Sequence, residues 1–208
     1  SVCALVCIFA LSACGKSQSG NTVSETEWSN IFGGTFNKFT MSYTLTDEDG
    51  VDSAPVVYKF DFVNKYFYMS YLEKETVYQV IYTDEGNNKG YNYAIWSGQT
   101  EWVRGSFVID NDTGFMFDSQ NEYYGFISLL KDKFSKFSYD EASGKYVCGT
   151  LKINDEMGTA EKVYVSIENG TLKSAEFENV VNSMMECSYV FTFDNFEIEI
   201  PEHFSEDL

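Results

Sequence analysis

The residues VVYKFDFVNKYFYMSYL (56 to 72) contain two segments typical of β-strands, separated by a link of three residues. Both segments are rich in β-branched and aromatic side chains, and apolar side chains recur at every second position in VVYKFDF (56 to 62), as expected of a strand. The link Val63-Asn64-Lys65 contains turn-forming residues and is short enough to require antiparallel neighbours. These residues therefore predict an antiparallel sheet.

The same pattern extends along the chain in both directions. Further strands are predicted by FTMSYTL (39 to 45), VYQVIYT (77 to 83), YNYAIW (91 to 96), KYVCGTLKI (145 to 153), EKVYVSI (161 to 167), LKSAEFENV (172 to 180), ECSYVFTF (186 to 193) and FEIEI (196 to 200). Trp102 and SFVID (106 to 110) predict one more strand or an edge. Polar segments such as TDEDG (46 to 50) and DEGNNKG (84 to 90) favour short turns between these strands.

Two helices are predicted to interrupt the strands. Ser24 is placed to cap a short helix, Glu27 stands three residues further on, and Gly33 and Gly34 end the helix. A long helix is predicted from about Ser119 to Lys136, because apolar residues recur there at helical spacing. The residues of this apolar stripe are Tyr123, Ile127, Leu130, Phe134 and Phe137. We expect the stripe to pack on a face of the sheet.

The sequence thus predicts a mostly β fold of the α+β class, in a single domain over residues 25 to 208. The expected architecture is a curved antiparallel sheet or half-barrel with one long covering helix and a short N-terminal helix. Several strands carry apolar side chains on both faces, which a single-layer sheet with a solvated back does not need. Either the sheet curls around a concave face that is plugged by the helix and lined for a ligand, or its two halves pack as layers.

The N-terminal segment has the character of a targeting signal. Residues 2 to 13 form an uncharged apolar run, whereas a bilayer-spanning helix needs roughly 20 apolar residues. The run has the length and small-residue end of a signal-peptide core, but an initiating Met and a positive start are missing. We therefore expect residues 1 to 13 to be a signal peptide truncated at its start. Residues 14 to 24 are polar and predict a flexible tether.

Leu11, Ser12, Ala13 and Cys14 resemble the lipobox of bacterial lipoproteins, in which small residues precede a cysteine that becomes the lipidated N-terminus. The resemblance implies cleavage before Cys14 and anchoring by lipid to the outer side of a cell membrane. In that family the cysteine carries two acyl chains, which meets the requirement of more than one lipid signal for stable anchoring. The extracellular side of a Gram-positive membrane is favoured over a periplasmic one. The alternatives are a secretory signal cut near Ala13, with Cys14 incidental, and a buried N-terminal helix.

The body of the chain also resembles a known family. The segments that carry this resemblance are TEWSNIF (26 to 32), FSKFSYDEASGKYVC (134 to 148), VSIENGTLKSAEF (165 to 177) and FEIEIP (196 to 201). With the order of tether, short helix, strands, helix and strands, the chain resembles the LolA and LppX-like half-barrel lipoproteins and, more closely, a group of uncharacterised Gram-positive surface lipoproteins. This resemblance implies a fold rather than an activity, because its motifs are patterns of turns and strands.

Composition excludes some classes of function. The 44% of hydrophobic and 17% of aromatic residues are too many for a disordered chain. The formal net charge of −18, from 32 acidic and 14 basic residues, repels the phosphates of nucleic acid, so a nucleic-acid partner is not expected. Cys148 and Cys187 are the two cysteines of the body, and they either form a disulfide or remain buried thiols.

The sequence predicts no catalytic residue, metal or cofactor. His203 is the single histidine and lies near the end of the chain, so Ser-His or Cys-His catalysis and His-based metal sites are not supported. A hydrolase that needs two carboxylates is not distinguished among 32 acidic residues. The acidic loops TDEDGVD (46 to 52) and DNDTG (110 to 114) suit calcium in composition, but neither completes an EF-hand loop, and both are better interpreted as turns.

The abundant aromatic residues suggest a binding protein. The first hypothesis is a non-enzymatic, surface-anchored carrier of a hydrophobic or lipid-like ligand. The residues expected to line its site are Tyr58, Phe60, Phe62, Tyr78, Tyr82 and Trp96. Trp96 and Trp102, with Tyr91 and Tyr93, were also candidates for a stacking platform for sugar rings or an apolar wall. The alternative is an accessory envelope protein that binds a protein partner or a cell-wall glycan.

Overall fold

The computed structural model describes residues 22–47, 49–71, 77–84, 89–96, 98–108, 125–155, 158–181 and 186–206. The predicted signal peptide, Cys14, most of the tether and the acidic loop 110–114 lie outside the described residues. Among the helices that are described, none is both long and apolar enough to cross a membrane.

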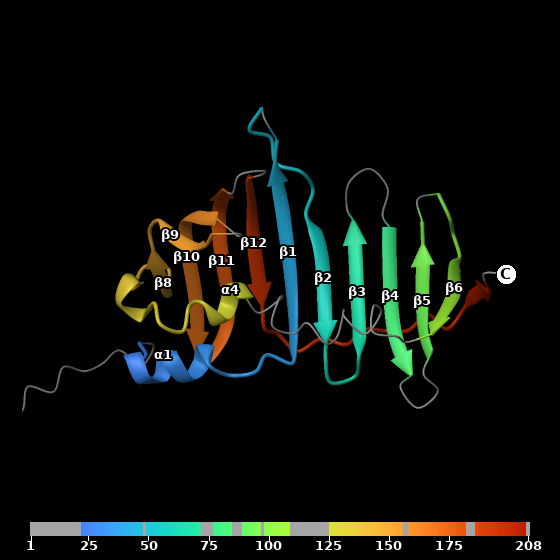
Figure 1. The fold of residues 1–208 in the computed structure, drawn as a ribbon, viewed down its shortest axis with the longest axis horizontal. Helices are drawn as coiled ribbons and strands as arrows, with labels where there is room; N and C mark the ends of the chain where they lie inside the picture. Colours follow the sequence, from blue (N-terminus) through green and yellow to red (C-terminus); the bar gives the residue numbers. More distant parts are fainter. Residues whose placement is uncertain are drawn as a thin grey trace, which may run out of the picture.

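Thirteen strands in the described part of the chain form one open sheet (Figure 1). The strands are β1 (Lys38–Thr46), β2 (Val56–Asp61), β3 (Tyr66–Tyr71), β4 (Val77–Asp84), β5 (Lys89–Ile95), β6 (Trp102–Val108), β7 (Ser138–Asp140), β8 (Lys145–Cys148), β9 (Leu151–Asn154), β10 (Gly158–Glu168), β11 (Thr171–Val181), β12 (Glu186–Thr192) and β13 (Phe204–Glu206). Their order is β13-β6-β5-β4-β3-β2-β1-β12-β11-β10-β8-β7, with β9 paired to β10. The prediction of a mostly β, antiparallel fold is confirmed, and the sheet does not close into a barrel.

Local turn chemistry explains the hairpins. The β2–β3 hairpin pairs Phe60 with Phe67 across a turn in which Lys65 has a positive φ of 58°. Asn169 (φ 51°) and Gly170 (φ 72°) join β10 to β11, and both adopt the left-handed conformation that a two-residue hairpin turn requires. Short links of this kind place sequence neighbours side by side, as the sequence predicts.

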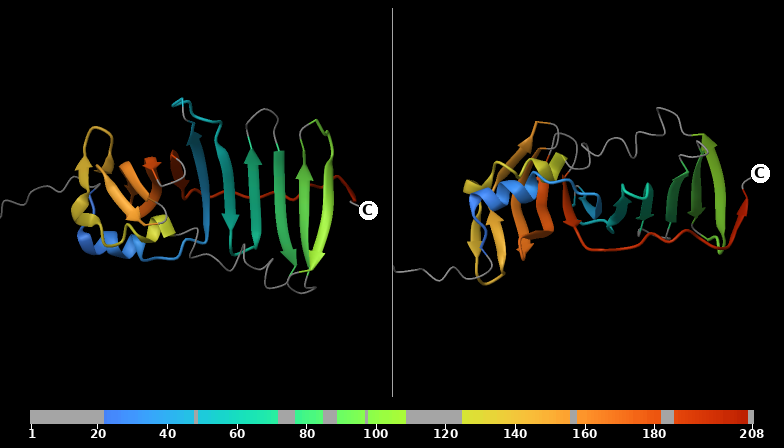
Figure 2. Two further views of the ribbon diagram at one scale, coloured as in Figure 1. Left: turned by 45° about the horizontal axis from the view of Figure 1, so that its top comes forward. Right: turned by 90° about the horizontal axis from the view of Figure 1, so that it is seen from below.

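Two predicted strands differ in the structure. The segment 145 to 153 bends at residues 149 and 150, which divides it into β8 and β9. Residues 196 to 200 are extended but pair with none of the described strands. They belong to residues 193–203, which we call the strap, and the strap crosses one face of the sheet to reach β13 (Figure 2). β13 pairs with β6 in parallel, at an edge of the sheet.

The short N-terminal helix is confirmed as α1 (Glu25–Phe32). Ser24 and Glu27 form a reciprocal capping box, and Gly33 is the C-cap. The long covering helix is not shown, and this prediction is corrected. Within its described part, a four-residue helix, α4 (Gly125–Ser128), and a 3-10 turn, η2 (Phe134–Lys136), are joined by turns. Residues 119–124 lie outside the described residues.

The apolar stripe that predicted the helix instead closes the core around one indole. Trp28 of α1 is fully buried, its Nε1 donates a hydrogen bond of 2.8 Å to the Leu130 carbonyl, and its ring lies 5.6 Å from Phe134 and 4.9 Å from Phe137 between ring centroids. Ile127 is buried in the same core. The periodicity therefore predicted positions that are buried at Ile127 and Leu130 and partly buried at Phe134 and Phe137. The continuous helix that it also predicted is not formed in the described part of the segment.

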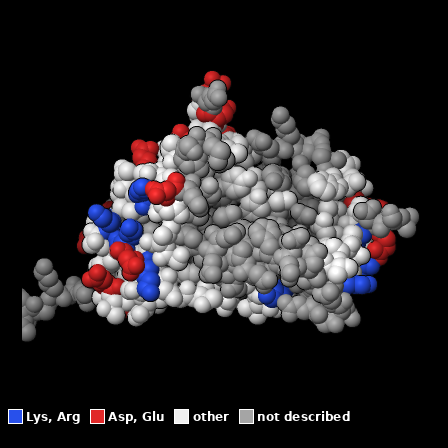
Figure 3. Space-filling model, in the orientation of Figure 1, with Lys and Arg blue, Asp and Glu red and all other residues white. Residues whose placement is uncertain are grey.

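The sheet has two different faces. The helix face carries Phe39, Phe60 and Phe191, which belong to the main core beneath α1 and the 127–137 segment. In the space-filling view of Figure 3, described charged residues gather near α1, near β13 and on the loop that follows β1 at the top of the view. The strap face is the opposite one, and it carries Lys59, Tyr68 and other residues that lie beneath the strap.

Candidate functional site

The strap is attached to the sheet at its first end by a lysine and a buried carboxylate. Lys38 Nζ donates a hydrogen bond of 2.7 Å to the Phe196 carbonyl and lies 2.9 Å from Asp61 Oδ2. Asp61 is only 2% exposed, and it also accepts hydrogen bonds from the Asn64 backbone at 3.0 Å and side chain at 2.8 Å. One carboxylate therefore holds both the β2–β3 turn and, through Lys38, the strap.

The environment of Asp61 favours its charged form. Burial alone would raise the pKa of the Asp61 carboxyl, because a charge is poorly solvated in the interior. The hydrogen bonds from Lys38 and Asn64 outweigh burial, so the pKa lies below its usual value. Asp61 is thus a structural anion of the strap attachment.

The other end of the strap is held by apolar packing and by β13. Ile198, 8% exposed, packs with buried Tyr93 in a small second core. Phe204 of β13 meets the Tyr93 ring edge-on, with centroids 5.2 Å apart. Arg104 lies over the Phe204 ring at 4.3 Å and pairs with Glu206, with its Nε 3.2 Å from Oε2. The strap is therefore fastened at both ends and crosses the sheet between them.

A cleft of about 720 Å³ opens where the strap crosses the sheet. Its lining residues are Lys59, Tyr68, Trp102, Glu197, Ile198, Glu199, Ile200, Pro201 and Glu202. We call this site the strap cleft. Lys59 Nζ lies 5.1 Å from the centroid of the Tyr68 ring, so a cation already rests against an aromatic ring in the cleft. The lining thus combines flat aromatic surfaces with carboxylates.

A second hollow of about 460 Å³ adjoins the strap cleft, and Trp102 and Glu202 line both. Lys59 belongs to β2 and Trp102 to β6, four strand positions apart in the sheet. At the usual strand spacing, the cleft therefore runs across about 19 Å of sheet. These dimensions suit an extended ligand better than a compact one.

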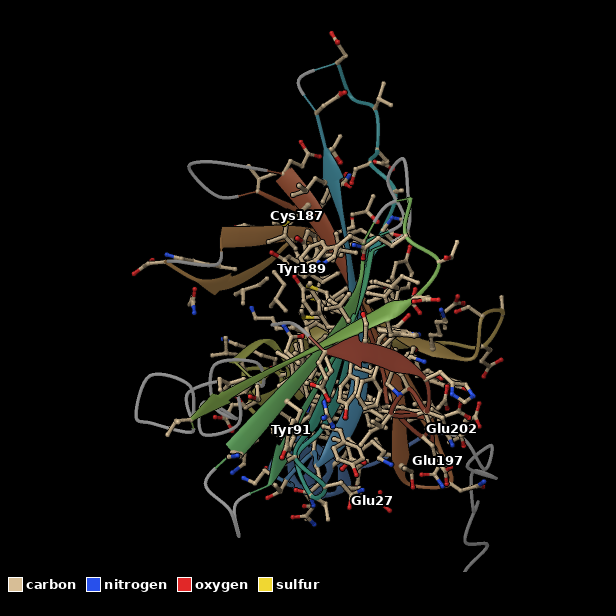
Figure 4. All side chains as sticks on the ribbon, turned by 90° about the vertical axis from the view of Figure 1, so that its right-hand side faces the viewer. Glu27, Tyr91, Cys187, Tyr189, Glu197 and Glu202 are labelled. Atoms are coloured by element: carbon tan, nitrogen blue, oxygen red, sulfur yellow. The ribbon has the colours of Figure 1, made fainter. Side chains whose placement is uncertain are left out.

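The alternating sequence of the strap explains its two sides. Phe196, Ile198 and Ile200 are half-buried or buried and pack with the aromatic residues of the strap face, whereas Glu197 and Glu199 between them are exposed. Period two is a property of extended chain, whether or not the chain is paired. Figure 4 looks along the sheet and places Glu197 and Glu202 on the same side of the molecule, away from Cys187 and Tyr189.

The sequence-predicted lining residues are not all brought together. Phe60 and Phe62 are 1% and 3% exposed on the helix face, where their rings stack at 5.6 Å between centroids. Tyr58, half-buried on the same face, stacks on Tyr43 at 6.0 Å. These three residues therefore lie on the opposite face from the strap cleft.

The other predicted lining residues, Tyr78, Tyr82 and Trp96, are not shown to line the strap cleft either. Tyr78 and Tyr82 pair in register with Ser70 and Tyr66, and their side chains lie outside the described part of the structure. Trp96 is 52% exposed at the end of β5 and does not line the strap cleft. Their role in ligand binding stays a prediction.

The stacking platform considered from the sequence is assembled only in part. Trp102 lines the strap cleft, whereas Tyr93 is buried beneath Ile198, and Tyr91 lies under Arg104 at 5.3 Å. Tyr68 and the strap glutamates were missed by sequence reasoning. The alternation of FEIEIP was their signal, but it was interpreted as a paired strand.

The two body cysteines are free thiols, and the disulfide considered from the sequence is not formed. Cys148 in β8 and Cys187 in β12 are both buried, with β10 and β11 between their strands. Three strand spacings separate them by about 14 Å, beyond the roughly 7 Å between Cα atoms that a disulfide allows. Burial raises the pKa of both thiols, which keeps them protonated and unreactive.

The acidic loop 46 to 52 is a turn, in agreement with the preferred interpretation. Asp47 Oδ1 accepts hydrogen bonds from the backbone of Asp49 at 2.9 Å and of Val51 at 2.8 Å, and Thr46 donates to Asp52 at 2.8 Å. Within the described ranges, no three His, Cys, Asp or Glu side chains are grouped as a metal site would need.

Comparison with known proteins places the chain in no family: no protein-family model matches it, and no curated protein matches its sequence significantly. The site is therefore interpreted from its own residues.

Proposed function

We propose that this chain is a non-enzymatic binding protein of the bacterial cell surface, anchored by lipid on Cys14, and that its strap cleft binds a glycan of the cell envelope. The observation that carries the proposal is the pairing of Tyr68 and Trp102 with Glu197, Glu199 and Glu202 in one open cleft. The half-barrel likeness and the extracellular Gram-positive location belong to the same proposal.

Sugar rings match such a lining chemically. A pyranose has apolar C–H faces, which pack on aromatic rings, and a rim of hydroxyl groups, which donate hydrogen bonds to carboxylates. Tyr68 supplies a ring near one end of the cleft, and Trp102 supplies one at its junction with the second hollow. An extended oligosaccharide would contact both rings and the strap between them.

A carrier of hydrophobic ligands, the first hypothesis from the sequence, has less support. Such a carrier needs an apolar cavity of roughly 300 Å³ or more. Phe60, one of its predicted lining residues, packs instead against Phe39 at 5.0 Å and Phe67 at 5.2 Å between ring centroids. The strap cleft is large enough but contains three carboxylates, which a lipid chain would desolvate at a cost.

Binding to the strap cleft is tested by calorimetry on the full chain in a mild detergent, with soluble oligosaccharides released from cell wall. Replacing Trp102 by Ala should weaken affinity about tenfold, because one aromatic contact is lost. Trp102→Phe, which keeps a ring, should retain most of the affinity and guards against a folding defect. Trp96→Ala is the matched control, since Trp96 is exposed outside the cleft. Equal binding by the Trp102→Ala and Trp96→Ala variants would refute the site.

Anchoring is tested separately in growing cells. Cys14→Ala should release the protein from the membrane fraction, because the thiol is the proposed attachment point of the lipid. Continued membrane attachment of this variant would exclude lipidation at Cys14 without bearing on the strap cleft.

A further inference from the structure

The strap cleft is bordered by unusually strong negative charge for a sugar site. Glu197, Glu199 and Glu202 line the cleft, and Glu101 lines the adjoining hollow. Among the described residues that line either space, Lys59 is the one Lys or Arg side chain. All four glutamates are exposed to solvent. Anionic envelope polymers would be repelled, and the net charge of −18 adds to this repulsion.

The strap face also brings cations and aromatic rings together repeatedly. Lys38 lies 5.2 Å from the Phe196 ring, Lys59 lies 5.1 Å from the Tyr68 ring, and Arg104 lies 4.3 Å from the Phe204 ring. A cation over an aromatic face is attracted by the ring quadrupole. These intramolecular contacts show that the surface accommodates positive charge through its rings as well as through its carboxylates.

From these observations we infer that the ligand is a linear oligomer of amino sugars with free, positively charged amino groups. The inference rests on the proposed function and specifies its ligand class. Each ammonium group would meet a strap glutamate, while the sugar rings pack on Tyr68 and Trp102. The run of the cleft across about 19 Å of sheet accommodates several linked rings.

A basic peptide shares this charge but fits the floor of the cleft less well. One common mode of binding for an extended peptide adds it as a strand to an open sheet edge, where backbone groups are available. The floor of the strap cleft is a face of the sheet, where the backbones of β2, β3 and their neighbours are paired with each other. A glycan needs no such edge, because it binds through ring faces and hydroxyl or amino groups.

The test is calorimetry on the full chain in detergent with two probes of equal length, a glucosamine oligomer and its N-acetylated, uncharged counterpart. The glucosamine oligomer should bind about tenfold more tightly, and this preference should fall as salt is added. The triple variant Glu197→Gln, Glu199→Gln and Glu202→Gln should lose the preference. Its matched control replaces Glu141, Glu168 and Glu178 by Gln, three exposed glutamates outside the cleft, and should keep it.

The outcomes separate the inference from the proposed function. Equal binding of both probes, unchanged in the triple cleft variant, would leave a glycan site in place and overturn the charged ligand. Loss of the preference for the glucosamine oligomer in the control variant as well would also overturn the charged ligand. The preference would then come from the net charge of the whole protein and not from the cleft. If neither probe binds, the glycan function itself is overturned. This holds whether a lysine-rich peptide of equal charge binds in their place or no ligand binds at all.

Discussion

The two ends of the sheet are covered in different ways. Strands β8 to β12 are closed on the helix face by α1 and the 127–137 segment, and Trp28, Phe32 and Leu130 are at most 1% exposed there. Strands β2 to β6 are crossed on the strap face by one extended segment, of which Ile198 alone is buried among the described residues. The first covering produces a core, and the second leaves a cleft.

The difference follows from the shapes of the two covers. A helix presents a broad apolar side and excludes water beneath it, whereas an extended chain buries every second side chain and leaves space on both sides. The strap residues between the buried ones are glutamates, so the space beside the strap is polar. The helix cover therefore closes part of the core, whereas the strap leaves a polar-lined surface on the opposite face of the sheet.

The largest effect is expected from Trp28→Ala in the helix-covered end. Removing an indole that contacts four rings and the Leu130 carbonyl should lower the free energy of unfolding by about 3–5 kcal/mol. Urea unfolding followed by circular dichroism measures this loss. Trp96→Ala, at an exposed tryptophan, should stay within about 0.5 kcal/mol of the parent protein. Similar losses of unfolding free energy for the two variants would contradict the distinction between the buried Trp28 and the exposed Trp96.

The attachment of the strap should depend on pH through Asp61. Asp61→Asn should cost about 1–3 kcal/mol of unfolding free energy at neutral pH, because Lys38 loses its buried partner. Since the pKa of Asp61 is lowered in the folded protein, its stabilisation is present above the ordinary carboxyl value and is lost as the pH falls through the folded value. The deficit should therefore shrink as the pH is lowered below the ordinary carboxyl pKa. A deficit that grows on acidification would show that Asp61 is not held in its charged form.

Much of the fold was predictable because strand periodicity is local. The alternation in residues 39–45, 56–62 and 186–193 predicted strands that the structure confirms as β1, β2 and β12. The same alternation at 196–200 gave the wrong pairing, because it reports extended chain and not the partner of that chain. The candidate site was harder to predict. Individual glutamates are uninformative among 32 acidic residues, and the approach of the strap to Trp102 is a long-range contact.

A smaller and local effect is expected from Ile198→Ala. The loss of buried aliphatic surface, worth about 2 kcal/mol, should speed exchange of the hydrogen-bonded amides of β13, which the strap joins to the sheet, by about thirtyfold. Exchange in α1 and β8 to β12 should not change, since the strap packs on the other end of the sheet. Val181→Ala, at an exposed valine of β11, is the control. Faster exchange throughout the molecule would show that the two ends unfold as one unit.

The smallest effect concerns the thiols of the helix-covered end. Alkylation under native conditions, followed by peptide mapping, should leave Cys148 and Cys187 unmodified, because both are buried and burial raises the pKa of each thiol. Both should react fully in denaturant without reductant. A pair that reacts only after reduction would establish the disulfide that the structure does not contain.

Whether the strap cleft is the binding site is tested most directly by hydrogen exchange of the full chain, with and without a saturating oligosaccharide. We predict slower exchange confined to the strap, to β3 and to β6, with α1 and β8 to β12 unchanged. Protection confined to the helix-covered end, with the strap unaffected, would contradict the assignment.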